Sequence, residues 1–130
     1  DYAKFHIEER KGDLFGGYAV VVDTFVSDRV LQKITEFNEK TRMNATAKKP
    51  FKPIEVSDDG LELIEYLSLD CSNTQGEWHS DSEIKIDKNG YVIRNGEKTK
   101  EFWDGTIYGE KKPLRLKIRN ICGDETEWGI

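Results

Sequence analysis

The sequence predicts an α+β fold: one amphipathic helix packed on a bent, mainly antiparallel sheet or partial β-barrel, in the order β-β-α-β-β-β-β, with or without one more strand. Segments in which apolar and polar residues alternate flank a single segment with helical spacing. Short turns rich in Gly, Asn and Asp separate the later segments. A length of 130 residues suits one compact domain, so we expect residues 1–130 to fold as a unit, complete or excised from a longer chain.

Two strands are predicted before the helix. Phe5 and Ile7 alternate with polar residues, as in a half-buried strand. The segment 18–26 is almost continuously apolar and rich in β-branched residues, which is typical of a central strand. The segment 12–17 between them contains the glycines of a turn.

The segment 28–42 is predicted to be a helix. Ser27 is a typical N-cap, and Asp28 falls in the first turn, where the helix dipole favours a negative charge. An apolar stripe at helical spacing should pack on the sheet, and it consists of Val30, Leu31, Ile34 and Phe37.

A basic loop is predicted after the helix. Prolines on both sides of Phe51 end any helix, and Lys48, Lys49 and Lys52 give the loop a local positive charge. Such a loop is either a solvated connector or a contact element.

The remaining chain is predicted to form strands joined by short turns. Residues 61–71 suit a strand or a short helix, and the alternation at the end of this segment favours the strand. The clearest hairpin spans 84–93. Turns at Asn95–Gly96 and Asp104–Gly105 precede a last strand over 114–118, extending toward residue 121.

The totals exclude several classes of protein. The net charge is −5 and the pI about 5.1, whereas nucleic-acid-binding domains usually carry excess Lys and Arg; a local basic patch can still override the total. The longest apolar runs fall far short of the ~20 residues of a membrane helix, so we expect no membrane contact and a cytoplasmic location. Zinc-type cysteine spacing is absent, and we expect no cofactor.

The cysteines permit two interpretations. Cys71 and Cys122 are too few for a disulfide scaffold in a chain of this length. We interpret them as two buried thiols in a reducing compartment. The alternative is a single bridge between the third strand and the last.

The first functional hypothesis is a non-enzymatic module that docks on another protein. Aromatic residues in loops, turns and the tail would form the docking surface, because such residues dominate protein interfaces. These candidates are Trp78, Phe102, Trp103, Tyr108 and Trp128. An acidic inhibitor or immunity-type protein would use such a surface against a basic partner. The acidic tail "GDETEWGI" is either a docking peptide or a frayed end.

The alternative is a sheet that binds single-stranded nucleic acid. If Leu114, Leu116 and Ile118 face the core, the intervening cations share the other face, ~7 Å apart and close to the phosphate spacing of a single strand. The candidate contacts are Lys111, Lys112, Arg115, Lys117 and Arg119, with Trp103 and Tyr108 as stacking platforms. The simpler interpretation is that these cations lie on the solvent-exposed face of a sheet, with glutamates on neighbouring strands as ion-pair partners.

A third hypothesis is a metal-dependent nuclease. Glu83 and Lys85 match an E-x-K half-site, and Asp70 would supply a second carboxylate for a divalent cation. A further combination is His79 oriented by Asp81 as a general base, but no Ser or Cys nucleophile has a recognisable sequence context.

Overall fold

The computed structural model describes residues 1–10 and 17–130 and confirms the α+β class. The predicted turn over 12–17 lies almost wholly outside the described residues. Two strands precede the helix: β1 (Tyr2–Glu9) and β2 (Tyr18–Val26). The helix is α1 (Asp28–Met43), and a short 3-10 helix, η1 (Leu61–Leu63), follows it. The later strands are β3 (Ile64–Asp70), β4 (Ser82–Ile86), β5 (Tyr91–Arg94), β6 (Glu97–Phe102), β7 (Thr106–Gly109), β8 (Arg115–Asn120) and β9 (Glu125–Gly129).

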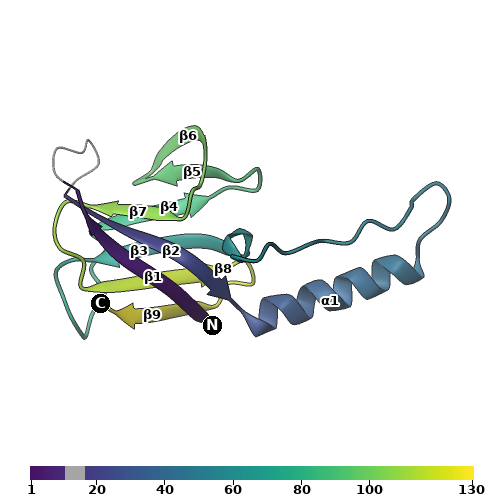
Figure 1. The fold of residues 1–130 in the computed structure, drawn as a ribbon, viewed down its shortest axis with the longest axis horizontal. Helices are drawn as coiled ribbons and strands as arrows, with labels where there is room; N and C mark the ends of the chain where they lie inside the picture. The colour runs from purple at the N-terminus through teal and green to yellow at the C-terminus, as the bar shows by residue number, and fades with distance from the viewer. Residues whose placement is uncertain (11–16) are drawn as a thin grey trace.

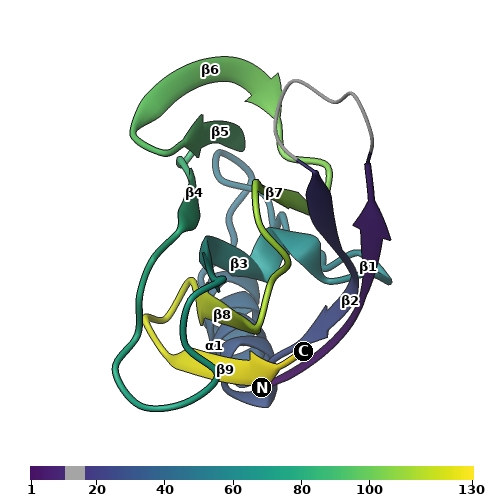
Figure 2. The same ribbon diagram turned by 90° about the vertical axis from the view of Figure 1, so that its left-hand side faces the viewer.

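The strands form two antiparallel sheets and not one continuous bent sheet (Figures 1 and 2). The small sheet has the order β1-β2-β7, so β2 is central as predicted, and the large sheet has the order β6-β5-β4-β3-β8-β9. The two sheets share one hydrophobic core. Val20 and Ile107 of the small sheet and Leu67, Leu116 and Ile118 of the large sheet are all fully buried in it.

Local sequence signals account for most of the element boundaries. Ser27 caps α1 by accepting a hydrogen bond from the N–H of Val30 (3.3 Å). The ambiguous segment 61–71 contains both alternatives, because η1 is followed directly by β3. The predicted hairpin is β4–β5. Asn95 and Gly96 both have positive φ (49° and 86°), which suits the tight turn between β5 and β6.

The chain after the helix contains more strands than the four or five predicted. The polar strand β6 has no apolar alternation, and β7 is only four residues long, so neither produces a strand pattern. The tail is neither a free docking peptide nor a frayed end, since it forms β9 along the edge of the large sheet beside β8.

The predicted apolar stripe of α1 packs on the core only in part, because Phe37 is 53% exposed. Only Val30, Leu31 and Ile34, near the start of the helix, contact the core. Beyond them the helix projects from the sheets, and the segment 44–60 returns beside it to η1 (Figure 1). We call residues 28–60 the arm. The amide of Asn38 fastens the two halves of the arm together: it donates to the carbonyl of Ile54 (3.0 Å) and accepts from the Ile54 N–H (2.8 Å).

Candidate docking surfaces

A buried ion pair joins β3 to β8. Asp70 and Arg115 lie directly opposite each other, with 2.7 Å between a carboxylate oxygen and a guanidinium nitrogen. Their side chains are 0% and 8% exposed. Burial alone would raise the pKa of Asp70, but hydrogen bonds from the backbone N–H groups of His79, Asn73 and Ser72 and from Arg115 hold the pKa well below its ordinary value.

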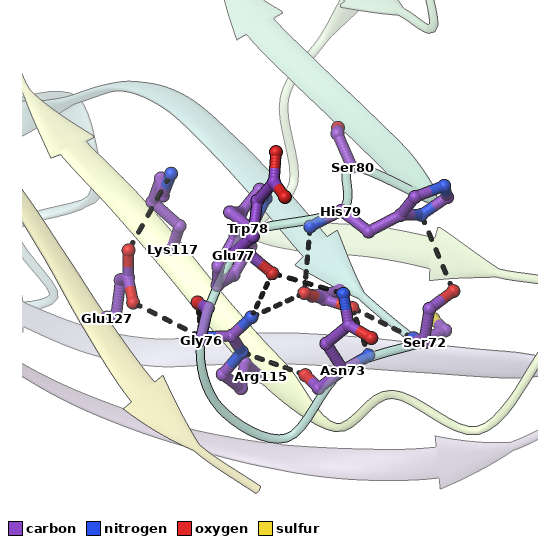
Figure 3. A network of polar contacts seen from close by, with 12 residues as sticks. Ser72, Asn73, Gly76, Glu77, Trp78, His79, Ser80, Arg115, Lys117 and Glu127 are labelled. Atoms are coloured by element: carbon purple, nitrogen blue, oxygen red, sulfur yellow. Dashed lines mark hydrogen bonds and ion pairs between the residues drawn. The ribbon is translucent and has the colours of Figure 1, made fainter.

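The same pair fastens the loop 71–81 onto the sheet (Figure 3). Besides Asp70, the Arg115 guanidinium donates to backbone carbonyls of this loop, at Asn73, Gly76 and Glu77. Asp70 therefore uses its oxygens to hold the fold. We interpret this network as structural, because every charged hydrogen-bonding group in it already has a partner.

The nuclease candidates lie near one another but do not form a metal centre. Glu83 on β4 accepts a hydrogen bond from the Tyr66 hydroxyl (3.0 Å), and Lys85 is exposed two residues further along. Asp70 is committed to Arg115. Among the described residues, no group of three or more His, Cys, Asp and Glu side chains could hold a metal ion.

The predicted cations of β8 are paired. Arg115, Lys117 and Arg119, which we call the basic row, lie on the outer face of the large sheet. Their carboxylate partners come from the two neighbouring strands. On β9, Glu127 lies 3.7 Å from both Arg115 and Lys117, and Glu125 lies 3.9 Å from Lys117 and 3.5 Å from Arg119. On β3, Glu65 lies 2.9 Å from Arg119. The basic row is thus largely neutralised, and Lys111 and Lys112 are exposed in the segment before it.

Aromatic rings do lie beside the basic row, although not the predicted ones. Trp78 packs against Arg115 and Lys117, with 4.8 and 4.4 Å from the charged groups to the ring centroid, and its indole N–H donates to Ser68 (3.0 Å). Tyr66 lies 4.6 Å from the Arg119 guanidinium. Trp103 and Tyr108 are not on strands next to β8. Sequence spacing could not identify Tyr66, because only strand pairing places it there.

The loop 71–81 also brings Ser72, His79 and Asp81 together. Nδ1 of His79 lies 3.4 Å from the Ser72 hydroxyl and 3.1 Å from the Asp81 carboxylate, and the Ser72 hydroxyl donates to Asp81 (3.0 Å). A hydrolytic triad needs the serine and the carboxylate on opposite ring nitrogens. Here both face the same nitrogen, so the arrangement does not activate Ser72.

Both cysteines are free, so the predicted alternative of a bridge is wrong. Cys122 is exposed and Cys71 half-buried, in contrast to the expected two buried thiols. Burial, together with the nearby Asp81 carboxylate, raises the pKa of Cys71 to about 11. Cys71 is therefore a poor nucleophile at neutral pH.

The docking candidates do not form one patch. Trp78 lies over the basic row. Trp128 lies opposite buried Leu116 and packs against the core, with its ring centroid 6.4 Å from that of Phe5 on β1. The guanidinium groups of Arg10 and Arg94 lie 5.3 and 5.1 Å from the Tyr108 ring. Only Phe102 and Trp103 line a shared cavity.

That cavity, which we call the groove, has a volume of about 760 Å³. Phe102 is 70% exposed and stacks on Tyr91, with ring centroids 4.9 Å apart. Trp103 is partly buried beside it and donates its indole N–H to the Thr106 carbonyl (3.0 Å). Ile121, which is 48% exposed, also lines the groove. The remaining apolar lining consists of Leu61, Ile64 and Ile86.

The rim of the groove is acidic. Its charged residues are Asp59, Glu62, Glu65, Asp87 and one cation, Lys88. A hydrogen bond from the Ser57 hydroxyl lowers the pKa of Asp59. Burial would raise the pKa of Glu62, but hydrogen bonds from the hydroxyl and N–H of Ser57 outweigh it. Both carboxylates are ionised at neutral pH, and neither has a cationic ion-pair partner within the described residues.

The arm presents a second surface, of opposite charge. Residues 40–54, which we call the arm tip, contain five basic residues and no acidic one: Lys40, Arg42, Lys48, Lys49 and Lys52. Since the whole chain carries −5 and the arm tip +5, the rest of the chain carries −10. Apolar side chains are exposed on the same part of the arm, with Phe37 at 53% and Met43 at 76%. The sequence predicts the basic loop but not this exposure, which depends on the helix leaving the core.

None of the described helices is long and apolar enough to cross a membrane. No family model matches the chain, and neither the curated proteins nor the solved structures contain a match to it.

Proposed function

We propose that this protein is a non-enzymatic binding module whose groove accepts a basic, partly apolar segment of another protein. One observation carries the proposal: exposed Phe102 and Ile121 lie beside partly buried Trp103, inside an acidic rim. Large apolar side chains in a concave site with a polar rim are typical of binding sites.

The apolar part of the groove is preorganised for binding. Stacking on Tyr91 restrains Phe102 before any partner arrives. A restrained aromatic ring loses little conformational entropy when a partner covers it, so most of the gain from burial is retained. Phe102 is therefore expected to be the main contributor to affinity.

The acidic rim selects the charge of the partner. Asp59 and Glu62 are ionised and held in place by Ser57, so their orientation does not change on binding. A basic segment would be attracted to this rim and an acidic one repelled. This is the behaviour expected of an acidic inhibitor or immunity-type protein against a basic partner.

The single-stranded nucleic acid alternative has less support, because a phosphate backbone would have to displace Glu125 and Glu127 from the basic row. The nuclease alternative has less support because Asp70 is engaged by Arg115. The basic row and Asp70 therefore lack the free charge that each chemistry requires of them.

A selection from random peptides displayed on phage tests the proposal. Enriched peptides are expected to combine Lys or Arg with aliphatic or aromatic residues, and Phe102→Ala should weaken their binding roughly 30-fold, as for a hot spot of about 2 kcal/mol. The matched control is Tyr2→Ala, which removes an aromatic side chain that is exposed outside the groove. Absence of enrichment, or equal effects of both variants, would contradict the proposal.

A further inference from the structure

We infer that the groove accepts the arm tip of a second copy of this chain, so that two copies form a two-fold symmetric dimer. The inference rests on the proposed function of the groove and names its occupant. It depends on three features: an uncovered arm tip, a groove of complementary character, and the position of the groove at the base of the arm.

Most cations of the arm tip lack an ion-pair partner among the described residues, and Arg42, which pairs with Glu39, is the exception. Lys40, Lys48, Lys49 and Lys52 form no ion pair with any described residue. Met43 and Ile54 are exposed beside them, and Phe37 is exposed on the neighbouring turn of α1. An exposed apolar group of this size rimmed by charges is typical of an interaction site.

The groove matches the arm tip in both charge and polarity. Its rim carries Asp59, Glu62 and Asp87, which form no ion pair with a described cation, against the unpaired lysines of the tip. Its exposed Phe102 and Ile121 would be covered by the apolar side chains of the tip. A nucleic acid would neutralise the lysines but leave Met43 and Ile54 in water, so the mixed surface favours a protein occupant.

The position of the groove determines how two copies would meet. Asp59 and Leu61 line the groove and belong to the segment in which the arm rejoins the sheets, whereas the tip lies at the far end of the arm (Figure 1). The 16 residues of α1 extend about 24 Å, so the tip points away from the groove of its own chain. Two arms lying antiparallel place each tip at the base of the other. Both contacts then form at once, and the assembly closes as a dimer.

Sedimentation velocity over a range of concentrations tests the inference. The wild-type chain is expected to pass from a 15.0 kDa monomer to a species of twice that mass, and the dimer should weaken as salt rises. Two variants disable one surface each: Lys48→Glu/Lys49→Glu at the tip, and Phe102→Lys/Ile121→Lys at the groove. All four positions are exposed, and circular dichroism checks that each variant is folded.

The mixture of the two variants is the decisive sample. Each variant alone should dimerise at least tenfold more weakly than the wild type. Mixed together, they should associate, because a wild-type tip meets a wild-type groove at one contact and a glutamate tip meets a lysine groove at the other. A contact through any other face would not show this recovery.

Three results would overturn the inference. The wild-type chain could stay monomeric at every concentration, or it could form a dimer that neither variant weakens. A labelled single-stranded oligonucleotide could instead bind the monomeric wild type but not the tip variant, which would assign the tip to a polyanion. If the groove still selects basic peptides in any of these cases, the proposed function stands and only the second copy is wrong as its occupant.

Discussion

At the scale of single residues, the Asp70–Arg115 pair shows how burial changes the meaning of a charged residue. A carboxylate at the end of an apolar strand is compatible with metal binding when only the sequence is known. In the structure Asp70 is fully buried, and its oxygens accept from Arg115 and from three backbone N–H groups. Its role is therefore to hold the loop 71–81 on the sheet.

Replacing Asp70 by Asn should destabilise the fold by about 3 kcal/mol at pH 7, because it leaves the buried Arg115 without its counter-charge. The folded-state pKa of Asp70 is lowered, so its contribution is present above the unfolded value of ~3.9 and is lost as pH falls below it. The difference in the free energy of unfolding between wild type and variant, measured by urea denaturation, should accordingly be smaller at pH 3 than at pH 7.

The matched control for this prediction is Asp58→Asn, which alters an exposed carboxylate in the segment before η1. It should change the free energy of unfolding by less than about 0.5 kcal/mol. If Asp70→Asn lowers the free energy of unfolding by the same amount at both pH values, the charge of Asp70 is not the source of its stabilising effect.

At the scale of elements, the arm is held by few tertiary contacts with the sheets. A 16-residue helix is marginally stable in water unless tertiary contacts stabilise one face, and α1 has such contacts only near its start. Its far half depends on the returning segment, which Asn38 holds through both backbone groups of Ile54.

Replacing Asn38 by Ala should release the segment 45–56 and increase the rate of trypsin cleavage after Lys48 severalfold, since proteolysis follows local opening. Lys49 and Lys52 precede prolines, and trypsin does not cut such bonds. Mass spectrometry of the digest, at concentrations where the chain is monomeric, identifies the cleaved bonds. Gln32→Ala is the control, because it alters an exposed position of the same helix that forms no bond to the segment. Equal cleavage of the two variants would show that the Asn38 clamp does not hold the arm together.

At the scale of the whole molecule, two sheets depend on one core. The small sheet contributes Val20, Val22 and Ile107 to the same cluster as the inner residues of the large sheet. Neither sheet buries its apolar face without the other, so the two should unfold together.

Replacing fully buried Ile107 by Ala should lower the free energy of unfolding by about 2–4 kcal/mol, through lost burial and the cavity that remains. Tryptophan fluorescence reports on the environments of Trp78, Trp103 and Trp128, whereas far-ultraviolet circular dichroism reports on all strands. The two signals should give coincident urea transitions in the wild type and in the variant. Separate transitions would mean that the sheets fold independently.

The sequence by itself determined the local features of this protein. The cap at Ser27, the bounds of α1, strand β2 and the hairpin β4–β5 follow from apolar periodicity and turn chemistry, which act over a few neighbouring residues. Only the tertiary structure decided which surfaces exist. Strand pairing supplied the glutamates that neutralise the basic row, and the early departure of α1 from the core exposed the arm tip. The groove combines residues as distant in the sequence as Asp59 and Ile121. No local sequence pattern predicts it, because it depends on contacts between distant parts of the chain.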